Sequence, residues 1–185
     1  MPTIAIIDDH EMFREGLVGL VQKAGEFKLL GQADDGKSGL QLIEDSLPDV
    51  AIVDVSMPSL GGLEVLKSVK HQKLPSKVIL LTSSDDPGLA RAAVDLKVDG
   101  YVLKEDAYRE LRDAIVAVDQ GKQYLSPSIS AALISAGSSS AADVLSKRER
   151  EVLAWIAEGL TDKEIADSLG VGTVSYTHLR AHETN

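Results

Sequence analysis

Four ionisable side chains and one hydroxyl stand at the ends of short apolar stretches in the first 104 residues. Asp8 and Asp9 follow the first stretch, Asp54 ends the third, and Thr82 and Lys104 lie at the ends of the next two. In an open parallel sheet the carboxyl ends of the strands face one crevice, so side chains far apart in sequence converge there. Three carboxylates in one crevice repel each other unless a cation lies among them, and hard divalent ions such as Mg2+ take oxygen ligands of this kind. We therefore expect a metal-dependent acidic pocket.

The pocket depends on elements that bring these residues together. Five short β-branched stretches alternate with amphipathic stretches before residue 121, which is typical of repeated βα units around a parallel sheet. The fold class is therefore predicted to be α/β, a doubly wound five-stranded parallel sheet with helices on both faces. The predicted strands are residues 3–7, 28–33, 50–54, 77–82 and 100–103. The predicted helices, where apolar residues recur three and four positions apart, are residues 11–24, 37–46, 63–72, 88–96 and 107–120.

The sequence changes character after Gly121. Residues 122–143 are rich in Ser and Ala and are predicted to be a linker, in which residues 127–135 form a short helix with proline at its first position. A helical pattern resumes at residue 144, breaks at Gly159 and continues over residues 162–169, with Thr161 as its cap. Two helices joined by a tight turn are half of a helix-turn-helix, so residues 144–173 are predicted to be a small all-α fragment.

The composition excludes several classes of protein. The 185 residues include no Cys, which rules out disulfides, thiolate zinc sites and cysteine nucleophiles. No apolar run reaches about 18 residues, and the first residues have a strand pattern, so we expect a cytoplasmic protein without a membrane span. The formal net charge is −10: residues 1–121 carry 13 Lys and Arg against 21 Asp and Glu, and residues 122–185 carry 6 against 8. Neither part is basic, which argues against a whole-surface nucleic-acid binder.

Five motifs in this order resemble those of bacterial response regulators of the NarL/FixJ type. The first four are IIDDH, VDVSMP with Asp54 and Pro58, LLTS with Thr82, and GYVLKE with Tyr101 and Lys104; the fifth is LSKREREVLAWIAEGLTDKEIADSLGV. Together they cover residues 3–172. The resemblance implies a flavodoxin-like receiver domain at residues 1–121 and a partial LuxR-type helix-turn-helix at residues 144–173.

The resemblance also assigns roles to the pocket residues. Asp54 is the phosphoacceptor, which takes a phosphoryl group from a sensor histidine kinase. Asp9, Asp54 and the backbone carbonyl of Ser56 are the Mg2+ ligands, and Asp8 contributes through a bound water. Lys104 pairs with a phosphate oxygen. The metal offsets the repulsion between a carboxylate nucleophile and an anionic phosphoryl group.

Thr82 and Tyr101 are the switch residues that the resemblance implies. The Thr82 hydroxyl binds another phosphate oxygen, and its movement leaves space into which Tyr101 swings inward. A ligand shifts such an equilibrium only by as much as it prefers one state, so the phosphoryl group must favour the active arrangement. In the family this shift promotes dimerisation or frees the C-terminal domain, and the sequence leaves both open.

The C-terminal end departs from the family pattern. After Gly172 the expected basic recognition helix is replaced by VSYTHLRAHETN, in which Arg180 is the only Lys or Arg. This string resembles a translated sequencing adapter, so residues 174–185 are interpreted as a non-native tail. We expect that the parent protein binds DNA and that this chain does not, and we assign no DNA-binding residue.

Two other functions compete with a transcriptional regulator. One is an Asp-dependent phosphohydrolase, but the first strand ends in Asp8-Asp9-His10 and lacks the alternating Asp-x-Asp of such enzymes. The other is a stand-alone receiver that acts as a protein-interaction module or a phosphate sink. We expect no enzyme activity beyond the phosphoryl transfer to the chain itself and its slow reversal. The histidines show no metal-ligand spacing and receive no catalytic role; they are His10, His71, His178 and His182.

Overall fold

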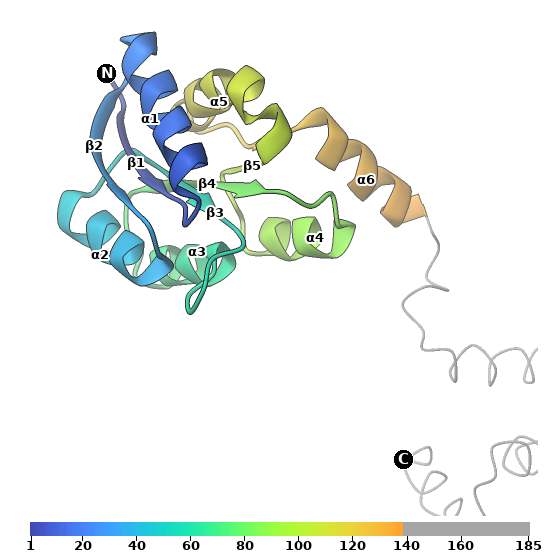
Figure 1. Ribbon diagram of the computed structural model, residues 1–185. Helices are drawn as coiled ribbons and strands as arrows, with labels where there is room; N and C mark the ends of the chain where they lie inside the picture. The colour runs from blue at the N-terminus through green and yellow to red at the C-terminus, as the bar shows by residue number, and fades with distance from the viewer. Residues whose placement is uncertain (139–185) are drawn as a thin grey trace, which may run out of the picture. The chain divides into compact units, whose positions relative to one another are not determined.

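The computed structural model describes residues 1–138 of the chain (Figure 1). The chain divides into two units, Met1–Ala136 and Gly137–Asn185, and the described residues form the first unit and the end of one helix. The last part of the predicted linker, the predicted helix-turn-helix at residues 144–173 and the tail at residues 174–185 lie outside the described residues.

A parallel sheet of six strands forms the centre of the first unit, in the order β2-β1-β3-β4-β5-β6. Five strands begin and end at the predicted residues: β1 Thr3–Ile7, β2 Lys28–Ala33, β3 Val50–Asp54, β4 Lys77–Thr82 and β5 Gly100–Leu103. This order places β1 beside β3, so the chain reverses its direction of winding between them and opens a crevice at their carboxyl ends. The flavodoxin-like fold class is confirmed, with one strand more than the sequence predicts.

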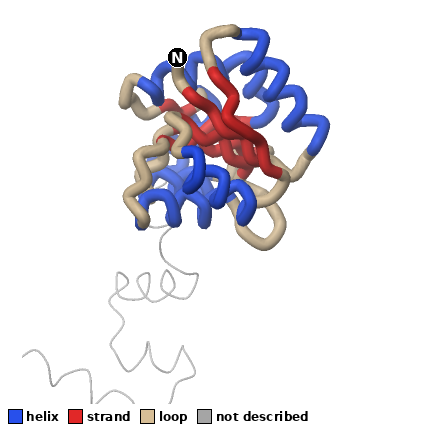
Figure 2. Tube along the Cα trace, turned by 90° about the vertical axis from the view of Figure 1, so that its left-hand side faces the viewer, coloured by secondary structure: helices blue, strands red, loops and turns tan. Residues whose placement is uncertain are grey.

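Helices cover both faces of the sheet, as the two layers in Figure 2 show. Helices α1 Glu11–Ala24 and α5 Lys104–Asp119 lie on one face. Helices α2 Gly36–Ser46, α3 Gly62–His71 and α4 Pro87–Asp95 lie on the other. Alternate residues of β1 explain why it is apolar throughout: Ile4 and Ile6 pack on the first face, and Ala5 and Ile7 on the second.

Helix α5 begins three residues earlier than the sequence predicts. It starts at Lys104, directly after β5, and Leu103 at its N-cap makes no side-chain cap hydrogen bond. The predicted start at Ala107 is therefore wrong, and no Ser, Thr, Asp or Asn cap before Lys104 marks the true start in the sequence. The consequence matters for the site, because Lys104 is held on a helix and not in a loop.

The short helix predicted at residues 127–135 is present, but a sixth strand before it and a buried residue within it correct the linker prediction. Strand β6 Tyr124–Leu125 pairs in parallel with β5, and α6 spans Pro127–Ser138. Ile129 of α6 is fully buried in the core on the α3 and α4 face. The first part of the predicted linker is therefore packed on the receiver, and a two-residue strand is too short to show a periodic pattern.

None of the helices between residues 1 and 138 is long and apolar enough to cross a bilayer.

Candidate functional site

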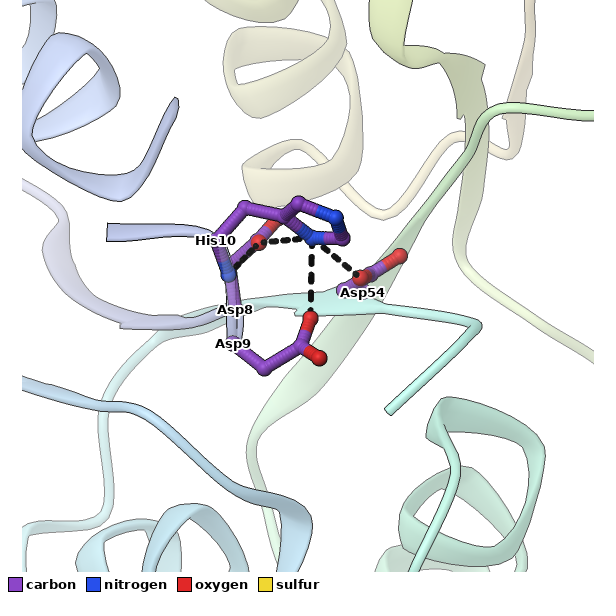
Figure 3. Close-up of side chains that lie close together, drawn as sticks. All are labelled: Asp8, Asp9, His10 and Asp54. Carbon is purple, nitrogen blue, oxygen red and sulfur yellow. Dashed lines mark hydrogen bonds and ion pairs between the residues drawn. The ribbon is translucent and has the colours of Figure 1, made fainter. Parts of the chain in front are cut away.

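Three acidic residues meet at the carboxyl ends of β1 and β3 (Figure 3). Asp8 and Asp9 directly follow β1, and Asp54 is the last residue of β3. Ligand atoms of these three carboxylates and of His10 all lie within 4.8 Å of one another. The structure thus brings together the acidic residues that the sequence predicts, because β1 and β3 are neighbours in the sheet.

Lys104 joins the two buried carboxylates of this cluster. Asp8 and Asp54 expose 0% and 1% of their surfaces, whereas Asp9 is partly open to solvent. Lys104 Nζ lies 2.8 Å from Asp8 Oδ2 and 2.8 Å from Asp54 Oδ2, and only 11% of its side chain is exposed. Buried charges need a partner of opposite sign, and one ammonium here serves two carboxylates. The cluster still holds three acids against one lysine.

Backbone groups hold the two buried carboxylates in place. The backbone N–H of His10 donates to Asp8 Oδ1 at 2.8 Å, and the backbone N–H of Ser56 donates to Asp54 Oδ1 at 3.2 Å. Gly62, the first residue of α3, packs against the backbone of Asp54 so closely that a Cβ there would overlap the Asp54 carbonyl. The start of α3 therefore helps to set the position of Asp54.

Burial raises the pKa of the Asp54 carboxyl group above its ordinary value. The Lys104 ammonium and the Ser56 N–H oppose this shift, and the negative charge of Asp8 adds to it. The Lys104 ammonium is the polar partner of the buried oxygens Asp8 Oδ2 and Asp54 Oδ2, and His10 Nδ1 is that of Asp9 Oδ1. A carboxylate oxygen has two lone pairs, so each of these atoms can also bind an oxygen-seeking cation.

His10 is part of the cluster, although the sequence analysis gives it no role. Its Nδ1 lies 2.9 Å from Asp9 Oδ1, 3.4 Å from Asp8 Oδ1 and 3.8 Å from Asp54 Oδ2, while 65% of its side chain is exposed. Figure 3 shows the ring nitrogen facing all three carboxylates. The sequence feature that could have indicated this contact is the position of His10 directly after Asp8 and Asp9. The spacing between histidines could not indicate it, because the partners of His10 are carboxylates.

Thr82 and Tyr101 lie on the neighbouring strands β4 and β5. The Thr82 hydroxyl donates to the Ser84 carbonyl at 3.2 Å and accepts from the Ser84 N–H at 3.1 Å. Tyr101 is fully buried, and its hydroxyl has no hydrogen-bond partner within residues 1–138. Burial raises the pKa of this phenol, and the nearby Thr82 hydroxyl offsets part of that shift. The ring thus already occupies the inside position into which it is predicted to swing.

Comparison with known proteins agrees with this architecture. The family model of the response regulator receiver domain matches residues 4–116, and that of bacterial regulatory proteins of the luxR family matches residues 143–181. The second match includes part of the segment interpreted as a non-native tail. The transcriptional regulatory protein NarL of Mycobacterium tuberculosis is 36% identical over 181 residues, which are 96% of this chain and 84% of that protein. LiaR of Bacillus subtilis is 32% identical over 190 residues, with coverage of 100% and 89%.

Solved structures give the same result. The receiver domain of the Mycobacterium tuberculosis NarL superposes with a TM-score of 0.63 and 34% identity, and covers 65% of this chain and 98% of that one. An RcsB–DNA complex matches with a TM-score of 0.70 and 29% identity, covering 92% of this chain and 84% of that one.

The chain therefore belongs to the response regulators of the NarL/FixJ type, with a receiver domain and a LuxR-type DNA-binding domain. It is a two-component response regulator, and its relatives are transcriptional regulators. Neither the phosphohydrolase nor the stand-alone receiver is favoured by these matches.

Proposed function

We propose that Asp54 is the phosphoacceptor and takes a phosphoryl group from a phosphohistidine of a sensor histidine kinase. A carboxylate oxygen of Asp54 forms a bond to phosphorus while the bond from phosphorus to the donor imidazole nitrogen breaks. The products are an acyl phosphate on Asp54 and a free imidazole, which takes up a proton. The observation that carries the proposal is the pairing of two buried carboxylates from neighbouring strands with one ammonium at 2.8 Å each.

The acidic cluster fits an Mg2+ ion. Asp9, Asp54 and the backbone carbonyl of Ser56 would hold it, and Asp8 would help through a bound water. The carboxylate oxygens of this cluster are ligands of the hard kind that this ion prefers, and they lie close enough together to share one ion. When bound, Mg2+ offsets the repulsion between the Asp54 carboxylate and the incoming anionic phosphoryl group.

Lys104 and Thr82 are the proposed partners of the phosphoryl oxygens. Lys104 already lies within reach of Asp54 and offers a compact cation. The Thr82 hydroxyl must leave its bonds with Ser84 to reach the phosphoryl group, and this exchange is the proposed trigger. Because Tyr101 is already buried, the trigger would stabilise its inside position and not create it.

We further propose that phosphorylation controls DNA binding, either through dimerisation or through release of the C-terminal domain. The similar structures include RcsB bound to DNA and RcsB dimers bound to two parallel DNAs. We expect DNA binding from a chain that carries the native recognition helix and none from the chain that ends in VSYTHLRAHETN. A gel-shift assay on the two chains, each with and without phosphorylation, tests this part.

Phosphorylation by a small phosphodonor tests the proposal for Asp54. The chain is incubated with acetyl phosphate and Mg2+, and its intact mass and its elution as monomer or dimer are measured. We expect the mass of one phosphoryl group per chain, its absence in Asp54→Asn, and its absence when a chelator removes Mg2+. A phosphoryl group that persists in Asp54→Asn would refute the assignment, and repeated turnover of the donor would indicate an enzyme.

A further inference from the structure

The ammonium of Lys104 has a third neighbour besides the two carboxylates. It lies 4.9 Å from the centroid of the Phe13 ring, over the ring face. An ammonium has three N–H donors, and its attraction to an aromatic face extends to about 6 Å from the centroid. The ring therefore covers a side of the ammonium that Asp8 and Asp54 leave open, which agrees with the low exposure of the Lys104 side chain.

The Phe13 ring is itself held by a second aromatic residue. Phe13 lies in the first turn of α1, and the Tyr108 ring of α5 meets it edge to face, with centroids 5.8 Å apart and planes at 78°. Tyr108 follows Lys104 by four residues on α5, so both side chains lie on the same face of that helix. A Cβ at Gly16 would overlap the Tyr108 hydroxyl, so the absence of a side chain at Gly16 makes room for this ring.

We propose that Phe13 is a positioning residue that holds the Lys104 ammonium at the pocket for phosphoryl transfer to Asp54. Lysine has a flexible four-carbon stem, and an ammonium with water on its open side would sample several positions. The ring face limits these positions and excludes water, so the phosphoryl oxygen meets a cation that is already in place. This inference rests on the proposed role of Asp54. It means that α1 helps to position the Lys104 ammonium, which α5 carries.

Removal of the ring face tests the proposal through the rate of phosphorylation. Phe13→Leu should slow phosphorylation by acetyl phosphate roughly 2- to 5-fold, the range expected from loss of a partly exposed cation–π contact. Phe13→Trp keeps an aromatic face and should react at about the wild-type rate. The Mg2+ dissociation constant, measured by calorimetry, should stay unchanged in both, because the Phe13 side chain has no oxygen or nitrogen atom that could bind the ion. A general loss of structure would change both quantities and would not be rescued by tryptophan.

Phe27 provides a matched control because it is the only other Phe in the chain. It is buried in the same core cluster as α1 and α5, and it precedes β2 at the opposite end of the sheet from the carboxylates. Phe27→Leu should lower the thermal stability and leave the phosphorylation rate unchanged. An equal loss of rate in Phe27→Leu and Phe13→Leu would overturn the proposal, and so would a folded Phe13→Leu chain that reacts at the wild-type rate.

An NMR measurement keeps the test valid if Phe13→Leu does not fold. In the wild-type protein the Lys104 ε-methylene protons should show an upfield ring-current shift, and the shift should persist in Phe13→Trp. Unshifted ε-methylene protons in the wild type would refute the positioning role. Failure of the proposed function is distinguishable, because in that case the wild-type chain itself would gain no phosphoryl group.

Discussion

Replacement of Lys104 by methionine should destabilise the Mg2+-free protein more than any other single charge removal at the site. Methionine keeps an unbranched apolar stem of similar length but removes the ammonium that lies 2.8 Å from both Asp8 and Asp54. The variant would leave two buried carboxylates close together without a cation. Removal of one partner of a buried ion pair is costly because the remaining charge is buried and unpaired.

The expected loss follows from these distances. At an effective dielectric constant of about 20, charges 2.8 Å apart attract by about 6 kcal/mol, and the cost of burying the ammonium cancels part of this. We expect the free energy of unfolding to fall by about 3–5 kcal/mol at neutral pH. For a unit of this size the midpoint of thermal unfolding should fall by roughly 10–15 °C.

Urea unfolding in a chelator at neutral pH measures this loss. Lys67→Met is the matched control, because Lys67 is exposed on α3 and should change the stability by less than about 1 kcal/mol. The double variant Lys104→Met/Asp54→Asn should recover about 2 kcal/mol or more, since it removes one of the two unpaired charges. Equal stability of Lys104→Met and wild type, or a loss that Asp54→Asn does not relieve, would refute the reasoning.

Three further variants test other parts of the structure. Burial raises the folded pKa of Asp54, so the stability that this group contributes is present at low pH and lost as the pH rises through that pKa. The amide side chain that Asp54→Asn introduces does not ionise, so the Mg2+-free variant should be more stable than wild type at pH 7. Urea titrations at several pH values should show this difference in the free energy of unfolding shrink as the pH falls through the folded pKa of Asp54. Gly39→Ala should lower the free energy of unfolding, measured by urea titration, by about 1–2 kcal/mol, because its Cβ would overlap Ile7 and this outweighs the gain in helix propensity. Asp35→Ala should cost about 1 kcal/mol in the same assay, since the Asp35 side chain caps α2; an unchanged midpoint in either variant would contradict the corresponding contact.

The strands were the most predictable part of the fold. Strands β1, β3, β4 and β5 are short, mostly apolar runs, which a strand buried on both faces of a parallel sheet needs, whereas β2 is a partly exposed edge strand. Helix ends were less predictable: the starts of α2, α3 and α4 differ by one residue from the predicted ones, and α5 differs by three. Helix α4 has a side-chain cap at Asp86, whereas α5 follows β5 without one.

The candidate site also has residues that the sequence predicts and contacts that it does not. The acids, Thr82 and Lys104 were identifiable because each follows or ends a strand with a clear pattern, and the carboxyl ends of parallel strands share one edge. The position of His10 beside the Asp8-Asp9 pair was a signal, but its contact with all three acids did not follow from it, because an exposed histidine after a strand has many possible orientations. The buried position of Tyr101 also depends on packing that includes Ile129, 28 residues later in the chain.

The sequence by itself determined the order of the elements, the identity of the acidic residues and the family, because these depend on local patterns and on motifs in a set order. Only the tertiary structure decided that one ammonium joins Asp8 and Asp54, and that Phe13 and Tyr108 support this ammonium from α1 and α5. These contacts depend on side-chain rotamers and on the distance between two packed helices. Both quantities result from the packing of the whole domain, and no local stretch of residues encodes them.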